Sequence, residues 1–187
     1  MIPDDDDRSS SEAALVARAK AGDQLAFQRL IETHAPRLLK IATATLRDKS
    51  DAEEAVQDAL AQAWLKLDSF DSDRRIEPWL ARITLNKARD LARRMRWRRL
   101  LTPWSVDDHH QVSGPDPVEA ILDRDLLRTL ERRIADLPAS LREAFVLVTI
   151  DGRSQAEAAE ILDITEKAVE TRIYRARNGL RKIIADR

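Results

Sequence analysis

Apolar residues recur every three or four positions along most of this chain, and charged or polar residues fill the positions between them. Val56, Leu60, Ala63, Trp64 and Leu67 show this spacing most clearly. A repeat of that length places apolar side chains along one face of a helix, whereas the alternation of a half-buried strand is absent. Glycine, which destabilises helix interiors, occurs four times. The pattern therefore predicts an all-α fold.

Start and stop signals divide this helical pattern into elements. Asp23 is expected to cap a long second helix after Gly22 ends the first one. Pro36 is expected to kink or interrupt that helix, because proline lacks a backbone donor. Capping boxes are predicted at SDAE, residues 50–53, and at SQAE, residues 154–157. The expected helices span residues 11–21, 23–46, 50–67, 77–99, 118–137, 138–150, 154–162 and 165–187.

Residues 102–117 interrupt the helical pattern, because this stretch contains three prolines and a glycine among polar residues. Such a composition is typical of an exposed linker. We therefore predict an acidic disordered N-terminus at residues 1–10, a small helical domain at 11–99, an irregular linker at 100–117 and a second small helical domain at 118–187. A chain of 187 residues is long enough for two small cores.

The most informative local pattern is a short helix, a turn and a second helix near the C-terminus. The turn is expected to start at Asp163, and Thr165 is expected to cap the second helix. This arrangement is typical of a helix-turn-helix, whose second helix lies in the major groove of DNA, although an arginine-rich solvated helix is the alternative interpretation. With Val169 and Ile173 inward, the residues expected outward or beside that face are Lys167, Glu170, Thr171, Tyr174, Arg175 and Asn178.

Charge is strongly segregated along the chain, although the net formal charge is only −1. Residues 74–99 contain ten basic and two acidic side chains, and residues 165–187 contain seven basic and three acidic ones. Two separate basic patches indicate contact with a polyanion such as nucleic acid at two places. Each patch taken alone is equally consistent with a solvated helix face.

Several other classes of function find little support in the sequence. The chain has no cysteine, which excludes disulfides and thiolate zinc sites, and it shows no phosphate-binding glycine loop or nucleophile turn. His109 and His110 lie near Asp107 and Asp108, but adjacent residues rarely converge on one metal ion. No stretch approaches the length of a membrane span, and no signal-peptide pattern opens the chain. We therefore expect a soluble cytoplasmic protein with no enzymatic activity, cofactor, metal or small-molecule substrate.

Two sets of sequence motifs lie on either side of the linker. The first set comprises AF at 26–27, APRLL at 35–39, DAEEAVQD at 51–58, AW at 63–64, Phe70, PWLARI at 78–83 and Asn86. The second set comprises LP at 137–138, REAF at 142–145, GRSQAEAA at 152–159 and VETRIYRAR at 169–177. These sets resemble, in order, the first domain and the promoter-reading domain of the extracytoplasmic-function (ECF) sigma factors, which belong to the RNA polymerase sigma factor superfamily.

The resemblance implies roles for three surfaces. The last helix would read the minus-thirty-five element of a promoter with Lys167, Glu170, Thr171, Arg172, Tyr174, Arg175 and Arg177. A loop and a basic helix would hold the non-template strand of the minus-ten element, including a flipped base, with Phe70, Asp71, Ser72, Arg74, Asn86, Lys87 and Arg89. An acidic helix would dock on the clamp helices of the polymerase's largest subunit with Asp51, Glu54, Gln57 and Asp58. The implied partners are core RNA polymerase, through these clamp helices and the flap, promoter DNA and an anti-sigma factor.

Two residues depart from the family's pattern. Asp163 occupies a turn position where members commonly have glycine, and aspartate tolerates a left-handed backbone better than most residues. Glu170 stands where many members have lysine or arginine, so the promoter sequence that this helix reads is expected to be unusual. The resemblance also implies that the acidic linker mimics nucleic acid near the active-site cleft, but a flexible tether explains its composition equally well. Trp64 and Trp79 fit core packing best, since both lie in apolar stripes.

Three hypotheses about function follow. The leading one is an alternative sigma factor that binds core RNA polymerase, directs it to specific promoters and helps open the minus-ten region. The second is a free-standing regulator that binds duplex DNA as a dimer, which would need a sensor or dimerisation domain that residues 23–99 do not show. The third is a helical interaction protein without DNA contact, whose basic residues would tolerate charge reversal.

Overall fold

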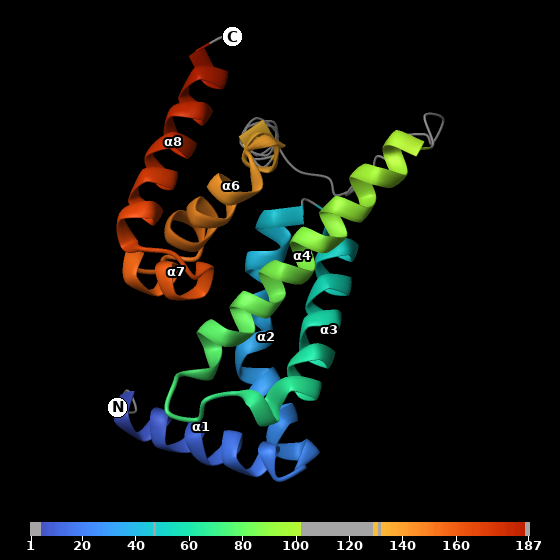
Figure 1. Cartoon of the computed structure of the whole chain (residues 1–187), viewed down its shortest axis with the longest axis vertical. Coiled ribbons are helices and arrows are strands. Elements are labelled where there is room, and N and C mark those ends of the chain that lie inside the picture. The colour runs from blue at the N-terminus through green and yellow to red at the C-terminus, as the bar shows by residue number, and fades with distance from the viewer. Residues whose placement is uncertain (1–4, 47, 102–128, 131, 186–187) are drawn as a thin grey trace, which may run out of the picture.

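The computed structural model describes residues 5–101 except residue 47, together with residues 129, 130 and 132–185. Residues 102–117 of the predicted linker lie outside these residues. Within them all regular structure is helical and no strand is present, which confirms the predicted all-α fold. The helices are α1 (Asp5–Lys20), α2 (Gln24–Leu46), α3 (Lys49–Lys66), η1 (Leu67–Ser69), α4 (Ile76–Leu101), α6 (Ala139–Phe145), η2 (Val146–Ile150), α7 (Gln155–Leu162) and α8 (Glu166–Ala185) (Figure 1).

The first domain is a bundle of α2, α3 and α4, with α1 crossing one end of it (Figure 1). Helix α3 packs against both α2 and α4, and α1 packs against α2. The Trp64 ring lies with its centroid 5.0 Å from that of Phe27, so Trp64 packs against the core, as predicted, although it is only partly buried. The largest fully buried side chains of this domain are Leu30, Leu38, Ile41, Leu67, Ile76, Leu80, Leu85 and Thr84.

The second domain contains a helical segment at residues 132–136, followed by α6, η2, α7 and α8. Both α6 and α7 pack against α8. The single helix predicted over 138–150 is therefore present, but its last five residues form a π-helix, η2, in place of an α-helix. The largest fully buried side chains of this domain are Val146, Leu147, Ile161 and Val169.

Two helix starts differ from the sequence prediction. Helix α1 begins at Asp5, six residues before the start that the sequence predicts. Helix α3 is capped by Asp48, whose carboxylate accepts a hydrogen bond from the backbone N–H of Asp51 at 3.0 Å. The predicted capping box at residues 50–53 is therefore wrong, because the earlier aspartate supplies the cap.

Helix α2 is uninterrupted where a kink or break was predicted, and α4 ends later than predicted. Helix α2 passes through Pro36 without interruption, and it packs against α1, α3 and α4. Burial on three sides outweighs the single backbone hydrogen bond that proline removes. Helix α4 continues to Leu101, which extends it two residues into the predicted linker.

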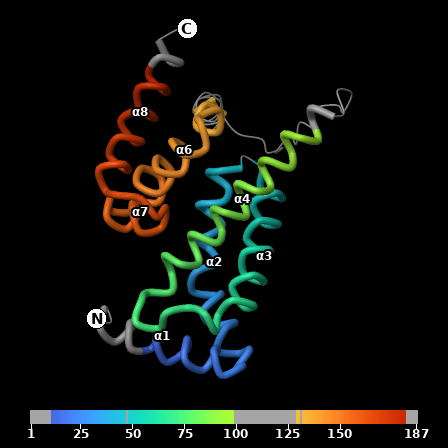
Figure 2. Tube along the Cα trace, in the orientation of Figure 1, coloured from blue at the N-terminus to red at the C-terminus, as the bar shows by residue number. Residues whose placement is uncertain are grey.

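The two domains pack against each other in this structure. Helix α7 contacts α4, and η2 contacts α2 (Figure 2). The buried apolar side chains of both domains form one continuous cluster. This packing brings the helix-turn-helix of the second domain beside the basic helix of the first.

Candidate nucleic-acid interface

The helix-turn-helix begins with the capping box that the sequence predicts. The Ser154 hydroxyl oxygen accepts a hydrogen bond from the backbone N–H of Glu157 at 3.1 Å, and the Glu157 carboxylate accepts one from the backbone N–H of Ser154 at 3.0 Å. The hydrogen bond from the Ser154 backbone holds the pKa of Glu157 below its ordinary value. The two orphan donors at the start of α7 are thus satisfied.

Replacing Ser154 with alanine is expected to lower the free energy of unfolding by about 1 kcal/mol, because the N–H of Glu157 loses its partner. Urea titration followed by circular dichroism measures this change. The matched control is Ser50→Ala in the first turn of α3, where Asp48 provides the cap. Its free energy of unfolding is expected to stay within about 0.5 kcal/mol of the wild-type value. Equal losses in the two variants would contradict this account of the caps.

The turn between α7 and α8 depends on Asp163. Its backbone lies in the left-handed region, with φ 57° and ψ 50°, as the sequence predicts for this position. The backbone N–H of Ile164 then donates to the carbonyl of Ala159 at 3.1 Å, which closes the end of α7. Thr165 caps α8 as expected, since its hydroxyl accepts from the backbone N–H of Ala168 at 3.2 Å. These contacts fix the angle at which α8 leaves the turn.

Helix α8 buries one face and exposes another. Val169, Ile173, Ala176 and Leu180 are buried, which agrees with the predicted inward face. Lys167 and Glu170 pair at 2.7 Å, and the Thr171 hydroxyl donates to the carbonyl of Lys167 at 2.8 Å. Arg172 is half-buried at the edge of the face. The exposed members of the predicted minus-thirty-five set are Lys167, Glu170, Thr171, Tyr174, Arg175 and Arg177.

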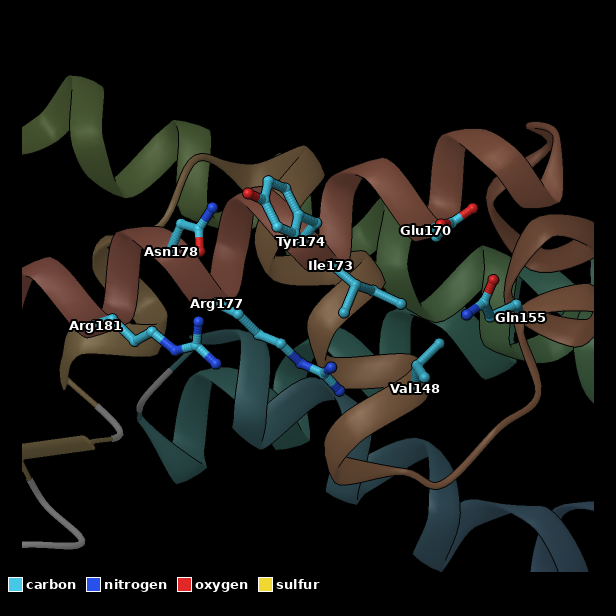
Figure 3. A pocket seen from close by; sticks show the side chains of 8 residues that line it. All are labelled: Val148, Gln155, Glu170, Ile173, Tyr174, Arg177, Asn178 and Arg181. Atoms are coloured by element: carbon cyan, nitrogen blue, oxygen red, sulfur yellow. The ribbon is translucent and has the colours of Figure 1, made fainter.

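A hollow of about 320 Å³ lies between α8, η2 and the start of α7. Figure 3 shows Tyr174, Arg177 and Arg181 on the α8 side of it, with Val148 from η2 and Gln155 from α7 across from them. Tyr174 exposes 66% of its surface, which is a large fraction for an aromatic side chain. An exposed tyrosine among arginines can contact bases, sugars or phosphates.

A second hollow, of about 210 Å³, lies at the loop before α4. Phe70 and Trp79 line it, and their ring centroids are 5.0 Å apart. The Lys20 ammonium donates to the carbonyl of Phe70 at 2.8 Å, which ties this loop to α1. The hollow includes Phe70, Asp71 and Arg74 of the predicted minus-ten set, while Ser72 lies exposed in the same loop. The other residues that line it are Ser69, Arg75, Pro78, Arg82 and Glu160.

Sequence reasoning missed part of this hollow. Trp79 was expected to pack in the core, and it does contact the apolar cluster, but it is only partly buried and also lines the cavity. Arg75 lies in the loop just before α4 and Arg82 lies seven positions later on α4, both within the basic stretch, so the charge pattern could have identified them. Glu160 comes from α7 of the other domain, and no local sequence pattern could have placed it there.

The remaining predicted minus-ten residues lie further along α4. Arg89 binds Glu143 of the second domain through two hydrogen bonds, of 2.9 and 2.7 Å, and Glu143 raises the pKa of Arg89 above its ordinary value. Arg89 also donates to the side-chain oxygen of Asn86 at 3.2 Å, while Lys87 is half-buried. Arg89 therefore already has an anionic partner in this structure.

The predicted polymerase-docking residues lie on α3. Glu54, Gln57 and Asp58 are exposed, and Asp51 is half-buried in the first turn. Leu65 lies seven residues after Asp58, which puts it on the same side of the helix, and 82% of its surface is exposed. The sequence reasoning missed this leucine, although an apolar residue on a polar helix face was visible in the periodicity.

Within the described part of the chain, no group of three histidine or acidic side chains is arranged to hold a metal ion. His34 is buried and bonds Glu12 across the α1–α2 contact at 3.1 Å, which lowers the pKa of Glu12. None of the described helices combines the length and the apolar composition that crossing a bilayer requires.

Comparison with known proteins shows to which class of protein this chain belongs. The Sigma-70 region 2 family matches residues 30–99, and the family Sigma-70, region 4 matches residues 127–180. The chain is 37% identical to the RNA polymerase sigma factor CnrH of Cupriavidus metallidurans, over 98% of this chain and 97% of CnrH. It is 31% identical to the ECF RNA polymerase sigma factor SigW of Bacillus subtilis, over 91% of this chain and 95% of SigW.

Two solved structures have a similar fold. The structure of CnrH in complex with the cytosolic domain of CnrY matches with a TM-score of 0.71 and 34% identity, over 94% of this chain and 98% of that one. The sigma factor RpoE of Bartonella quintana, in complex with the anti-sigma factor NepR, matches with a TM-score of 0.61 and 26% identity, over 85% of this chain and 96% of RpoE. The present chain belongs to the ECF RNA polymerase sigma factors.

This membership decides between the first two hypotheses. The resemblance and the sigma factor hypothesis are confirmed, because both sigma-70 regions are present in the family's order. The alternative of a free-standing regulator is wrong, since the first domain is a sigma-70 region and not a sensor or dimerisation module. The sigma factor family is not a family of catalytic enzymes.

Proposed function

We propose that three surfaces divide the work of this sigma factor. Helix α3 binds core RNA polymerase with Asp51, Glu54, Gln57 and Asp58. The loop before α4 and the basic face of α4 hold the non-template strand of the minus-ten element. Helix α8 reads the minus-thirty-five element from the major groove. No catalytic step, cofactor or metal is part of this function.

The observation that carries the proposal is the hollow beside Phe70 and Trp79. Trp79, the partly exposed ring of this pair, offers a stacking surface, and Arg74 and Arg75 at the edge of the hollow supply the charge that a phosphate backbone requires. Stacking of a base on an aromatic ring returns about 1–3 kcal/mol, which offsets the cost of pulling the base out of the duplex. A site with both features favours single-stranded DNA over duplex.

The outer face of α8 has the chemistry of base reading. Arginine can bind the O6 and N7 atoms of guanine with two hydrogen bonds, and the methyl group of threonine suits the methyl group of thymine. The Thr171 hydroxyl is already bonded to the helix backbone, so its methyl group is the part that remains for DNA. Glu170 pairs with Lys167, which reduces the repulsion that this carboxylate would exert on phosphates.

Alanine at Arg175 or at Thr171 is expected to weaken recognition of the minus-thirty-five element by about 1–3 kcal/mol each, because each removes a base-reading side chain. Competition binding of the polymerase holoenzyme to promoter fragments with intact and scrambled upstream elements measures this loss. Arg29→Ala, an exposed arginine of α2, is the matched control and should bind both fragments like the wild type. A variant that keeps the full preference for the intact element would count against α8 as the reading helix.

Run-off transcription tests the function as a whole. Purified core polymerase is incubated with genomic DNA fragments, with and without this protein. Transcripts that start at defined sites in the presence of the protein alone support the proposal. The absence of any such start, despite stable binding to core polymerase, would reject it.

We also propose an anti-sigma factor as a partner of this chain. RpoE of Bartonella quintana is bound by the anti-sigma factor NepR, and CnrH is bound by the cytosolic domain of CnrY. The present chain shares the fold of both proteins over most of its length, which supports a partner of the same kind.

A further inference from the structure

Helix α1 holds the loop that precedes α4 at the start of that loop. Lys20, the last residue of α1, donates one hydrogen bond to the carbonyl of Phe70 at 2.8 Å and one to the hydroxyl of Ser72 at 3.3 Å. Lys20 is half-buried, and its contacts reach across 50 and 52 positions of the sequence. Hydrogen bonds from a charged donor are stronger than those between neutral groups. A single side chain of α1 therefore fixes the loop at two residues of the predicted minus-ten set.

The end of α1 is a rigid support for this lysine. Val16 and Ala19 are buried, and the backbone N–H of Gly22 donates to the carbonyl of Ala19 at 3.0 Å. Gly22 adopts φ 91°, a left-handed conformation that glycine accepts without steric cost, so the chain turns sharply into α2. Arg18 and Asp23 bind each other across this turn at 2.6 Å. These contacts hold the base of the lysine side chain while its ammonium group holds the loop.

A second contact of α1 lies at the other end of the same loop. Glu12, about two turns earlier on α1, is half-buried and bonds the imidazole Nε2 of His34 at 3.1 Å. The hydrogen bond to His34 lowers the pKa of Glu12, and a hydrogen bond from the backbone N–H of Ile76 acts in the same direction. Ile76 is the first residue of α4. Helix α1, which crosses the end of the bundle in Figure 1, therefore contacts both ends of the loop.

Hydrogen bonds within the loop set its shape, and contacts with other elements set its position. The Asp71 carboxylate accepts a hydrogen bond from the backbone N–H of Asp73 at 3.1 Å, and the Asp71 carbonyl accepts one from the backbone N–H of Arg74 at 3.1 Å. Asp71 and Arg74 also line the hollow beside Trp79, so the position of the loop decides the shape of this site. A loop that is held in place beforehand loses less freedom when it binds a ligand.

We propose that α1 positions the minus-ten loop, with Lys20 as a positioning residue that holds residues 70–75 in the geometry that admits an unpaired base. Lys20 acts through the loop and does not contact DNA. This inference rests on the proposed function, because it takes the hollow as the minus-ten site. The Sigma-70 region 2 match begins at residue 30, so α1 lies outside it. Without the lysine contact the loop adopts the competent geometry for only part of the time, which lowers the apparent affinity for DNA in proportion.

The first measurement follows the mobility of the loop in the full chain and requires no DNA. The chain has no cysteine, so Asp73→Cys, at an exposed position of the loop, carries a single nitroxide spin label. Lys20→Met removes the donors but keeps the apolar stem, and it is expected to narrow the spectral lines because the label moves faster. Lys20→Arg keeps the charge and the donors and should restore the wild-type spectrum. Lys40→Met, at an exposed lysine of α2, removes the same charge elsewhere and should also match the wild type.

The second measurement tests whether the position of the loop matters for DNA. Holoenzyme is assembled from core polymerase and each variant without the label, and it binds a promoter fragment mapped by run-off transcription whose minus-ten bases are left unpaired. Lys20→Met is expected to bind this fragment about tenfold more weakly than the wild type, while Lys20→Arg and Lys40→Met stay within about twofold. The slope of log affinity against log salt concentration should be the same for all of these proteins, because a positioning residue neutralises no phosphate.

Three outcomes would overturn the proposal. A Lys20→Met spectrum identical to that of Lys40→Met would show that α1 does not hold the loop. Weaker binding by Lys20→Met with a salt slope that is shallower by about 0.7–0.9 would show that Lys20 itself contacts a phosphate. A more mobile loop with unchanged DNA binding would show that minus-ten recognition does not depend on the position of the loop. In each case, run-off transcription by the wild type would leave the proposed function in place.

A second variant covers the case in which Lys20→Met loses its helical circular dichroism signal. Ser72→Ala removes only the longer of the two hydrogen bonds and leaves α1 unchanged. It is expected to increase the mobility of the spin label by a smaller amount than the loss of both contacts. A Ser72→Ala spectrum identical to that of the wild type would then overturn the proposal.

Discussion

Replacing Asp58 with lysine is expected to weaken the binding of core RNA polymerase about 100-fold, which corresponds to about 2.8 kcal/mol. Asp58 is exposed near the middle of α3, and Glu54 lies one turn before it on the same face. An acidic face of this kind binds a basic partner surface, and a lysine at its centre would place like charges opposite each other. Titration of labelled protein with purified core polymerase, followed by anisotropy, measures the loss.

The matched control for this prediction is Glu32→Lys on α2. Glu32 is exposed and undergoes the same change in charge, but it lies outside the proposed docking face. It should bind core polymerase within about threefold of the wild type, since a remote surface charge acts mainly through screened electrostatics. If Asp58→Lys and Glu32→Lys bound core polymerase equally well, α3 would not be the docking helix.

Replacing Leu38 with alanine is expected to lower the free energy of unfolding by about 2–5 kcal/mol. Leu38 is fully buried in α2, at the centre of the packing between α2 and the rest of the first domain. The substitution removes apolar contacts and leaves a cavity that the surrounding helices can only partly close. Urea unfolding followed by circular dichroism at 222 nm gives the change.

Leu25→Ala provides the control for this change in packing. Leu25 lies on the same helix and loses the same atoms, but 70% of its surface is exposed. The free energy of unfolding of this variant is expected to stay within about 0.5 kcal/mol of the wild-type value. Similar losses for the two leucines would show that α2 does not bury the face assigned to it.

The helices and their inward faces could be predicted from the sequence because each depends on local information. The apolar spacing around Val169 and Ile173 identified the buried side of α8, and the serine and glutamate at 154 and 157 identified its preceding helix. The left-handed turn at Asp163 followed from the same reasoning. Such features require the chemistry of a few neighbouring residues and no knowledge of distant ones.

Competition between neighbouring signals limited the prediction of helix starts. Asp48 and Ser50 are both good capping residues, and the sequence alone does not say which of them occupies the N-cap position. Helix ends are decided by small differences between such alternatives. The apolar face of α3 was nevertheless predicted, because it depends on the repeat and not on the cap.

The contact between the domains could not be predicted from sequence. Arg89 and Glu143 are 54 positions apart, and Arg153 and Glu77 are 76 apart. The sequence predicts a nucleic-acid surface on the basic stretch, and nothing local indicates that acidic residues of the second domain pair with part of it. Long-range charge pairing depends on the packing of whole helices, which a linear pattern does not specify.

Asp163 combines two separable properties, a left-handed backbone and a carboxylate that binds Arg82 of the other domain. Glycine at this position would keep the positive φ of the turn at no steric cost, but it would remove the carboxylate that binds Arg82. A β-branched residue would instead distort the turn itself. Glycine and asparagine variants would therefore separate the contribution of the ion pair with Arg82 from that of the left-handed turn.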